Sequence, residues 1–167
     1  SICNAIRFLP SLKYLSLKHN GFYSTAWIDL SLVMGSCKSL IEVDLSDNVW
    51  HPEFGKLFQL ALQYLKELKT LNLKHCEIDN ISCARIIEAF HRIQTFNCDE
   101  NPIFPITTRL QEAILSNLHL TKLIGIPWRY QAHLATRNRI IQKALHLLEH
   151  YHENHQLMLK TYIVLLE

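Results

Sequence analysis

Four segments of this chain share one spacing of apolar residues, and that spacing limits the folds open to the sequence. Each segment has apolar residues at its first, fourth and sixth positions and asparagine or cysteine at its ninth. The segments cover residues 12–20, 40–48, 68–76 and 93–101, so successive starts are 28, 28 and 25 residues apart. A near-fixed period of this length predicts repeated units that stack and bury their apolar residues in one shared core.

The middle of each segment predicts a short strand, because apolar side chains alternate there with polar ones. The expected strands are 14–17, 42–45, 70–73 and 95–98. Four core residues are then expected side by side on adjacent strands: Leu17, Leu45, Leu73 and Cys98. The asparagine that ends three of the segments is expected to hydrogen-bond backbone groups where the chain turns away from the strand.

Helices are expected in the segments that return from one strand to the next. Apolar residues with helical spacing indicate them at 24–34, 54–65, 82–90 and 107–115. Ser24 and Ser82 are placed to act as N-caps of two of these helices. A fifth unit starts at Leu120, but Ile126 comes one residue late and Pro127 prevents a regular continuation, so the array is expected to end there.

These patterns predict an α/β solenoid over residues 1–127, with a short parallel sheet on one face and helices on the other. It has four units and a degenerate fifth, and a helix end before the first unit indicates an array truncated at its N-terminus. Residues 128–167 lose the period and are expected to form helices at 131–150 and 156–166. Because a repeat array exposes apolar residues at its last unit, these helices are expected to cap it.

Composition argues against several classes of protein. Apolar residues make up 49% of the 167 residues, and the formal net charge is +2 at pH 7. A nearly neutral chain is unlike a nucleic-acid-binding protein, and no apolar run long enough to span a membrane occurs. The five cysteines cannot all pair with one another, and Cys76 and Cys98 face the expected core. We therefore expect reduced thiols and a cytosolic or nuclear protein, with a cytoplasmic location as the prediction.

The four segments resemble the leucine-rich-repeat superfamily, and their period with helical returns is most similar to its ribonuclease-inhibitor-like class. The resemblance implies strands that line a concave face, helices on the convex face, and binding of other proteins by the concave face. Residues 117–123, followed by Arg137, Asn138 and Arg139, are similar to the end of tropomodulin-type actin-capping domains. They are also similar to leucine-rich-repeat effectors that bacteria inject into host cells, which would place the protein in the host cytosol.

Alternation along the strands predicts which side chains face outward on the concave surface. The partner-binding residues expected there are Tyr14, Ser16, Lys18, His19, Glu42, Asp44, Asp47, Thr70, Asn72, Lys74, His75, Thr95, Asn97, Asp99 and Glu100, and Ser46 is expected to face outward with them. The charges at the turn positions alternate in sign from one unit to the next. Two interpretations stay open: exposed pairs that neutralise one another, and a charge pattern that fixes the register of a partner.

Two tryptophans follow repeat segments near one rim, Trp50 and Trp128. A tryptophan in such a place either packs a turn against the core or anchors an interface. The sequence leaves both interpretations open.

One stretch near the C-terminus has the spacing of a metal site. His146, Glu149 and His150 fit H-x-x-E-H, and two histidines one helical turn apart can share a zinc ion. A histidine-rich helix end explains the same residues without a metal, and the sequence identifies no third ligand. We expect no metal and no cofactor, with His146 and His150 as the candidate ligands if a metal binds. A zinc-dependent hydrolase is the alternative function.

The sequence thus predicts a monomeric, non-enzymatic module that binds another protein through its concave face. It is expected to work alone or as the recognition part of a larger regulatory or effector protein. No P-loop or glycine-rich phosphate motif occurs. No motif identifies the partner.

Overall fold

The computed structural model describes residues 5–22, 24–50, 55–90 and 92–151 of the chain. Short strands alternate with helices along it. The strands are β1 (Tyr14–Ser16), β2 (Glu42–Asp44), β3 (Thr70–Asn72), β4 (Thr95–Asn97) and β5 (Lys122–Ile124). The helices are α2 (Ser24–Met34), α3 (Gly55–Tyr64), α4 (Asn80–Ala89), α5 (Thr108–Ser116) and α6 (Trp128–Tyr151).

The five strands form one parallel sheet in the order β1-β2-β3-β4-β5. Successive strands pair without a shift in register, so equivalent positions of the repeats are direct neighbours. The central residue of each later strand points into the core and is buried, as in Leu71 and Phe96. The residues after the strands follow the same register, which confirms the expected row of Leu17, Leu45, Leu73 and Cys98, all buried.

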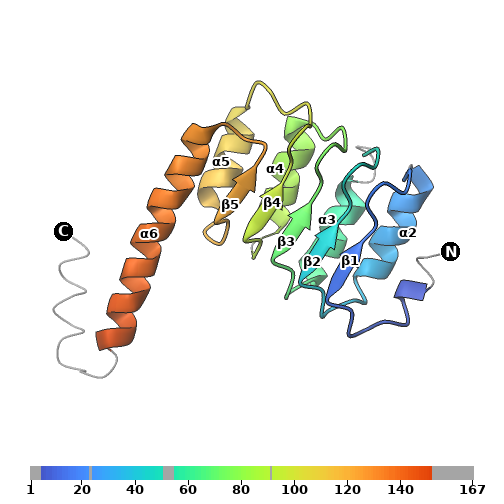
Figure 1. Cartoon of the computed structure of the whole chain (residues 1–167), viewed down its shortest axis with the longest axis horizontal. Helices are drawn as coiled ribbons and strands as arrows, with labels where there is room; N and C mark the ends of the chain where they lie inside the picture. The colour runs from blue at the N-terminus through green and yellow to red at the C-terminus, as the bar shows by residue number, and fades with distance from the viewer. Residues whose placement is uncertain (1–4, 23, 51–54, 91, 152–167) are drawn as a thin grey trace.

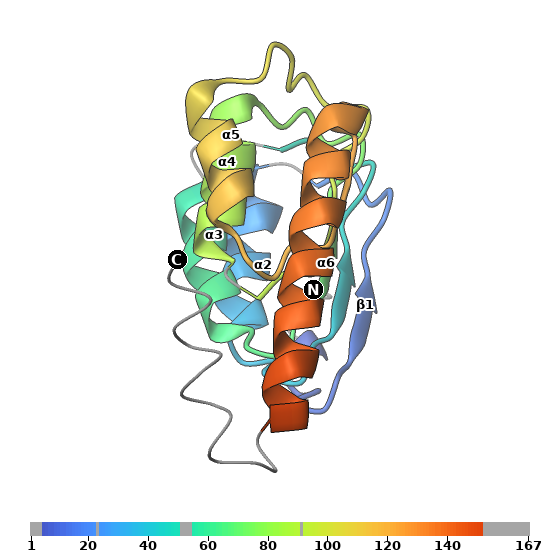
Figure 2. The same cartoon turned by 90° about the vertical axis from the view of Figure 1, so that its left-hand side faces the viewer.

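The molecule has two layers. Helices α2 to α5 lie side by side on one face of the sheet, and no helix of the described residues covers the other face (Figures 1 and 2). We call the sheet face without helices the open sheet face; it is the concave face expected from the sequence. The core lies between the layers, where Trp27 of α2 and Phe58 of α3 pack against each other and are almost fully buried.

Helix α6 lies across the β5 end of the array (Figure 2). It buries Leu134 and contacts β5. Arg137 donates hydrogen bonds to the carbonyls of Leu115 at 3.1 Å and Leu120 at 2.8 Å, where α5 ends and the chain turns towards β5. The Leu115 carbonyl belongs to the last turn of α5, where carbonyls have no partner within the helix, and Leu120 lies in the loop that follows, so Arg137 fastens α6 to the last unit. We propose that α6 serves as the terminal cap of the array.

Most of the expected helices agree with the structure, but one N-cap was wrong. The helix expected at 24–34 is α2, and Thr107 caps α5 at its predicted start. Ser82, expected to be an N-cap, lies inside α4, and Asp79 caps this helix by accepting a hydrogen bond from the Ser82 N–H at 2.7 Å. The helix expected at 156–166 lies outside the described residues.

Two asparagines hold successive turns together. The Nδ2 of Asn48 donates to the carbonyls of Leu17, Leu45 and Ser46, and its Oδ1 accepts from the N–H groups of Asn20 and Phe22. Asn101, two units further along the chain, makes the equivalent five bonds. Its Nδ2 donates to the carbonyls of Leu73, Cys98 and Asp99, and its Oδ1 accepts from the N–H groups of Cys76 and Ile78. Each amide thus satisfies backbone groups of two units at once, as expected for this position.

Cys76 stands where the other units have asparagine and makes a different set of bonds. Its Sγ donates to the carbonyl of Leu45 at 3.3 Å. The thiol has no oxygen that could accept hydrogen bonds as the Oδ1 of asparagine does. The backbone carbonyl of Cys76 accepts the backbone N–H of Trp50 instead, at 2.8 Å. The following residue, Glu77, adopts φ 59°, a left-handed conformation that is unusual for glutamate. The substitution changes the local turn and leaves the stacking of the units intact.

The buried thiol of Cys76 predicts a loss of stability at alkaline pH. Burial raises the pKa of this thiol from its ordinary value of 9.0 to about 11. The unfolded chain therefore loses this proton first, so the contribution of the neutral thiol is complete below pH 9 and is lost as the pH rises through about 11. For Cys76 alone we expect the free energy of unfolding to fall by roughly 2–3 kcal/mol. Urea unfolding measured at a series of pH values from below 9 to above 11 tests this.

The control for this prediction is Cys76→Ala. This variant keeps all the other groups that titrate at alkaline pH, so its stability should fall less steeply than that of the natural chain. Equal slopes in the two proteins would show that Cys76 does not contribute.

None of the helices in the described part of the chain has the length and apolar character needed to cross a bilayer.

Candidate functional site

The structure brings the predicted partner-binding residues together along the open sheet face and the turns that follow it. All of them are exposed or half-buried: Tyr14, Ser16, Lys18, His19, Glu42, Asp44, Asp47, Thr70, Asn72, Lys74, His75, Thr95, Asn97, Asp99 and Glu100. Ser46 was expected to face outward with them, and this expectation was wrong. Ser46 is buried because its N–H and Oγ both donate to Asp44 Oδ1, at 2.9 and 2.7 Å.

The turn residues form the alternating charge pairs that the sequence indicated. Asp47 lies 3.5 Å from Lys18 on one side and 3.1 Å from His75 Nδ1 on the other. Lys74 contacts Glu100 at 2.7 Å and Asp99 at 3.8 Å. The hydrogen bond from His75, with help from Lys18, lowers the pKa of Asp47, and the bond to Glu100 raises the pKa of Lys74. These pairs link neighbouring units and neutralise much of the charge in the turns.

A backbone feature of these turns gave no signal in the sequence. His19, Asp47, His75 and Glu100 all adopt left-handed conformations, with φ between 51° and 58°. They occupy the same position of each unit, directly before the asparagine or cysteine. Left-handed residues are usually glycine, and none of these four is, so composition could not mark them. The conformation turns the chain away from the sheet.

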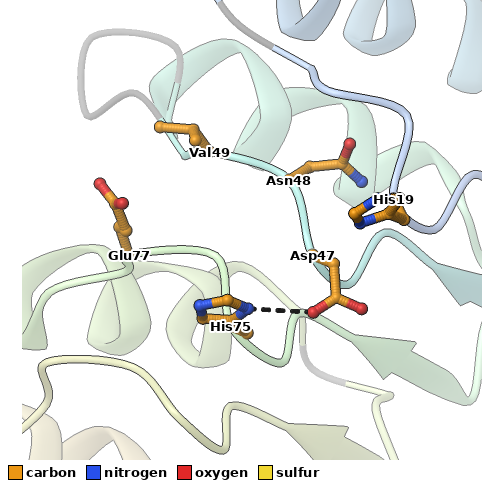
Figure 3. A pocket seen from close by; sticks show the side chains of 6 residues that line it. All are labelled: His19, Asp47, Asn48, Val49, His75 and Glu77. Atoms are coloured by element: carbon orange, nitrogen blue, oxygen red, sulfur yellow. Dashed lines mark hydrogen bonds and ion pairs between the residues drawn. The ribbon is translucent and has the colours of Figure 1, made fainter.

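A shallow pocket of about 360 Å³ opens between the first three turns. It is lined by His19, Asp47, Asn48, Val49, His75 and Glu77, and Figure 3 shows the two histidines on either side of Asp47. Its lining offers hydrogen-bonding and charged groups beside the exposed side chain of Val49. In the described part of the chain, no three His, Cys, Asp or Glu side chains gather as a metal site would require.

The strand positions of the open sheet face differ in how far the fold already uses them. Asp44 bonds to Ser46, and the side-chain oxygens of Asn72 and Asn97 accept the N–H groups two residues on, each at 3.1 Å. These side chains shape the turns. The neighbouring row consists of Tyr14, Glu42, Thr70 and Thr95, whose side chains make no hydrogen bond or ion pair with other described residues. The latter row is therefore available to a partner.

The remaining candidate residues lie in two other places. Trp50 is buried and packs against Trp27 and Phe58, with ring centroids 5.0 and 5.4 Å away, so it supports the core rather than an interface. The side chain of Trp128 lies outside the described residues. So do those of His146, Glu149 and His150, although their backbone belongs to α6. The H-x-x-E-H hypothesis therefore stays a prediction.

The arrangement of repeats is shared with known structures. The C-terminal domain of tropomodulin from Caenorhabditis elegans superposes with a TM-score of 0.73 over 88% of this chain and 99% of that chain, at 13% sequence identity. This chain has a leucine-rich-repeat fold. The second actin-binding site of leiomodin-1 is also similar, with a TM-score of 0.69 over 91% of this chain and 95% of that chain, at 14% identity.

Sequence comparison finds the same kind of repeat. A leucine-rich-repeat protein of Homo sapiens, "NACHT, LRR and PYD domains-containing protein 2", is 30% identical over 108 residues. The match covers 62% of this chain and 10% of the human protein, so the chain spans about a tenth of that relative. No protein-family model matches the sequence.

Proposed function

We propose that this leucine-rich-repeat chain is a protein-binding module whose contact surface is the open sheet face. The observation that supports the proposal is the uncommitted row of Tyr14, Glu42, Thr70 and Thr95. Because the strands pair in register roughly 4.8 Å apart, these side chains form a continuous line across four units. A surface of this kind binds an extended region of a partner through many small contacts.

Tyr14 is the strongest candidate anchor of such an interface. Its side chain is 66% exposed on an edge strand of the sheet, and exposed tyrosines are enriched among the residues that dominate binding energy. The charge pairs of the turns flank this row. Exposed pairs contribute little to stability, and in the proposed complex their sign pattern sets the register of the partner.

Actin is the first partner to test. The likeness to the second actin-binding site of leiomodin-1 extends over almost all of both chains. At 14% identity it carries the fold and no individual contact, so actin binding is a hypothesis for this chain. Cosedimentation with filamentous actin and a pulldown of monomeric actin test it directly.

Tyr14→Ala should weaken binding of the partner by roughly tenfold or more. The matched control is Tyr64→Ala, because Tyr64 is 61% exposed but lies on α3, on the opposite face of the molecule. Affinity capture from cell extract compares the natural chain with both variants, and the captured proteins are tested for actin. A partner that is lost with Tyr14→Ala and kept with Tyr64→Ala supports the open sheet face. A partner lost only with Tyr64→Ala would place the interface on the helices.

A further inference from the structure

A basic pocket lies on the rim where the strands begin, at the opposite end of the strands from the paired turns. It measures about 260 Å³ and is lined by Lys66, Glu67, Leu68, Lys69, Arg92, Gln94 and His119. These residues precede β3, β4 and β5, so three successive units contribute to it. We call Lys66, Lys69, Arg92 and His119 the basic rim.

The cations of the basic rim form no ion pair with another described residue. Lys66, Lys69 and Arg92 are all exposed. The ion pairs found among the described residues involve Lys18, Lys74, His75 and Arg109, and none of the rim residues. Glu67 is the single carboxylate of the lining. The turns at the other end of the strands neutralise themselves, whereas this rim keeps an excess of positive charge.

The positive charge continues along the rim beyond this pocket. Backbone hydrogen bonds join Lys13, Ile41, Lys69 and Gln94 in one row across the strand entries. Lys13 therefore lies two strands from Lys69, roughly 10 Å away, and the exposed Lys38 belongs to the intervening loop. The rim thus presents cations from each of the first four units.

We propose that the basic rim binds an acidic polypeptide segment. An extended segment places alternate side chains on one side, roughly 6.6 Å apart, so its successive acidic side chains can each reach a flexible cation of the rim, where neighbouring strands are roughly 4.8 Å apart. Arg92 offers a planar fork for a carboxylate, and the lysines supply point charges. The lining contains no Phe, Tyr or Trp, so it lacks the large stacking surface with which proteins hold single-stranded nucleic acid. Opposite charge also speeds association with an acidic segment.

The test uses the full chain and a fluorescein-labelled peptide in which glutamate alternates with serine. Fluorescence anisotropy should detect binding that weakens with added salt. Lys66→Glu combined with Lys69→Glu should reduce the affinity at least tenfold, and Lys66→Arg with Lys69→Arg should retain it. The control is Lys56→Glu with Lys143→Glu, which changes the net charge equally at exposed lysines on α3 and α6 and should have a smaller effect.

Three results would overturn the proposal: equal losses in the two charge-reversed variants, equal binding of a peptide with glutamine in place of glutamate, or tighter binding of a single-stranded RNA of matched charge. Tyr14→Ala should leave peptide binding unchanged because Tyr14 lies on the open sheet face. The basic rim and the proposed function can therefore fail separately. Circular dichroism of each variant tests whether it is folded.

Discussion

Gly125→Ala is expected to lower the free energy of unfolding by about 3–5 kcal/mol. Gly125 follows β5 and packs against the turn of the preceding unit. A Cβ at this position would overlap the backbone nitrogen of Asp99 and lie 2.6 Å from the carbonyl carbon of Cys98. Both atoms belong to the main chain, which cannot move aside as a side chain can. The φ of 92° adds strain for any residue with a Cβ.

Gly21 provides the control for Gly125. It also has a positive φ, 62°, but a Cβ there would meet no atom within 4 Å. Gly21→Ala therefore carries only the conformational cost, about 1–2 kcal/mol. Urea unfolding monitored by circular dichroism compares the two variants. If both lose the same stability, the last two turns do not lie in close contact in solution.

Asn48→Ala is expected to cost about 3–5 kcal/mol, because it removes five hydrogen bonds at a buried position. The substitution leaves the carbonyls of Leu17 and Leu45 and the N–H of Phe22 without their partner. Water can replace an amide only where it has access, and the Asn48 side chain is 2% exposed. The loss is large because one side chain joins two units.

Asn20 is the matched control for Asn48, since it holds the same position in the first unit. It is exposed, and among the described residues its side chain makes one hydrogen bond, from Nδ2 to the carbonyl of Lys18 at 2.9 Å. Asn20→Ala should therefore change stability by about 0.5 kcal/mol or less. Thermal and urea unfolding measure both. A loss at Asn20 as large as that at Asn48 would contradict the idea that bonds between units carry the effect.

The repeat spacing was enough to place the strands and the layers. Leu45 and Leu73 recur at intervals that only stacked coils can bury together, and the sheet confirms this at each pairing. Apolar periodicity reports which residues leave water, and burial is the dominant favourable term in folding. The same logic predicted the outward row from Tyr14 to Thr95 without any knowledge of the partner.

Spacing could not show which polar side chains the turns would use. Ser46 was expected on the surface, but Asp44 accepts two hydrogen bonds from it and holds it inside. Asp79, rather than Ser82, caps α4 for a similar local reason. In both cases the carboxylate of a nearby aspartate accepts a hydrogen bond from the serine. Whether the carboxylate can reach that donor depends on the path of the backbone.

By itself, the sequence determined the class of fold, the order of the elements and the side chains that face outward from the sheet, because these follow from where apolar residues recur. Only the tertiary structure decided the contacts between units. The left-handed turns are set by the path of the backbone within each unit. The close approach at Gly125, the bonds of Arg137 to the end of α5 and the grouping of Lys69 with Arg92 each join residues from different units. Such contacts depend on how closely the units stack, and no local pattern of residues encodes the distance between two units.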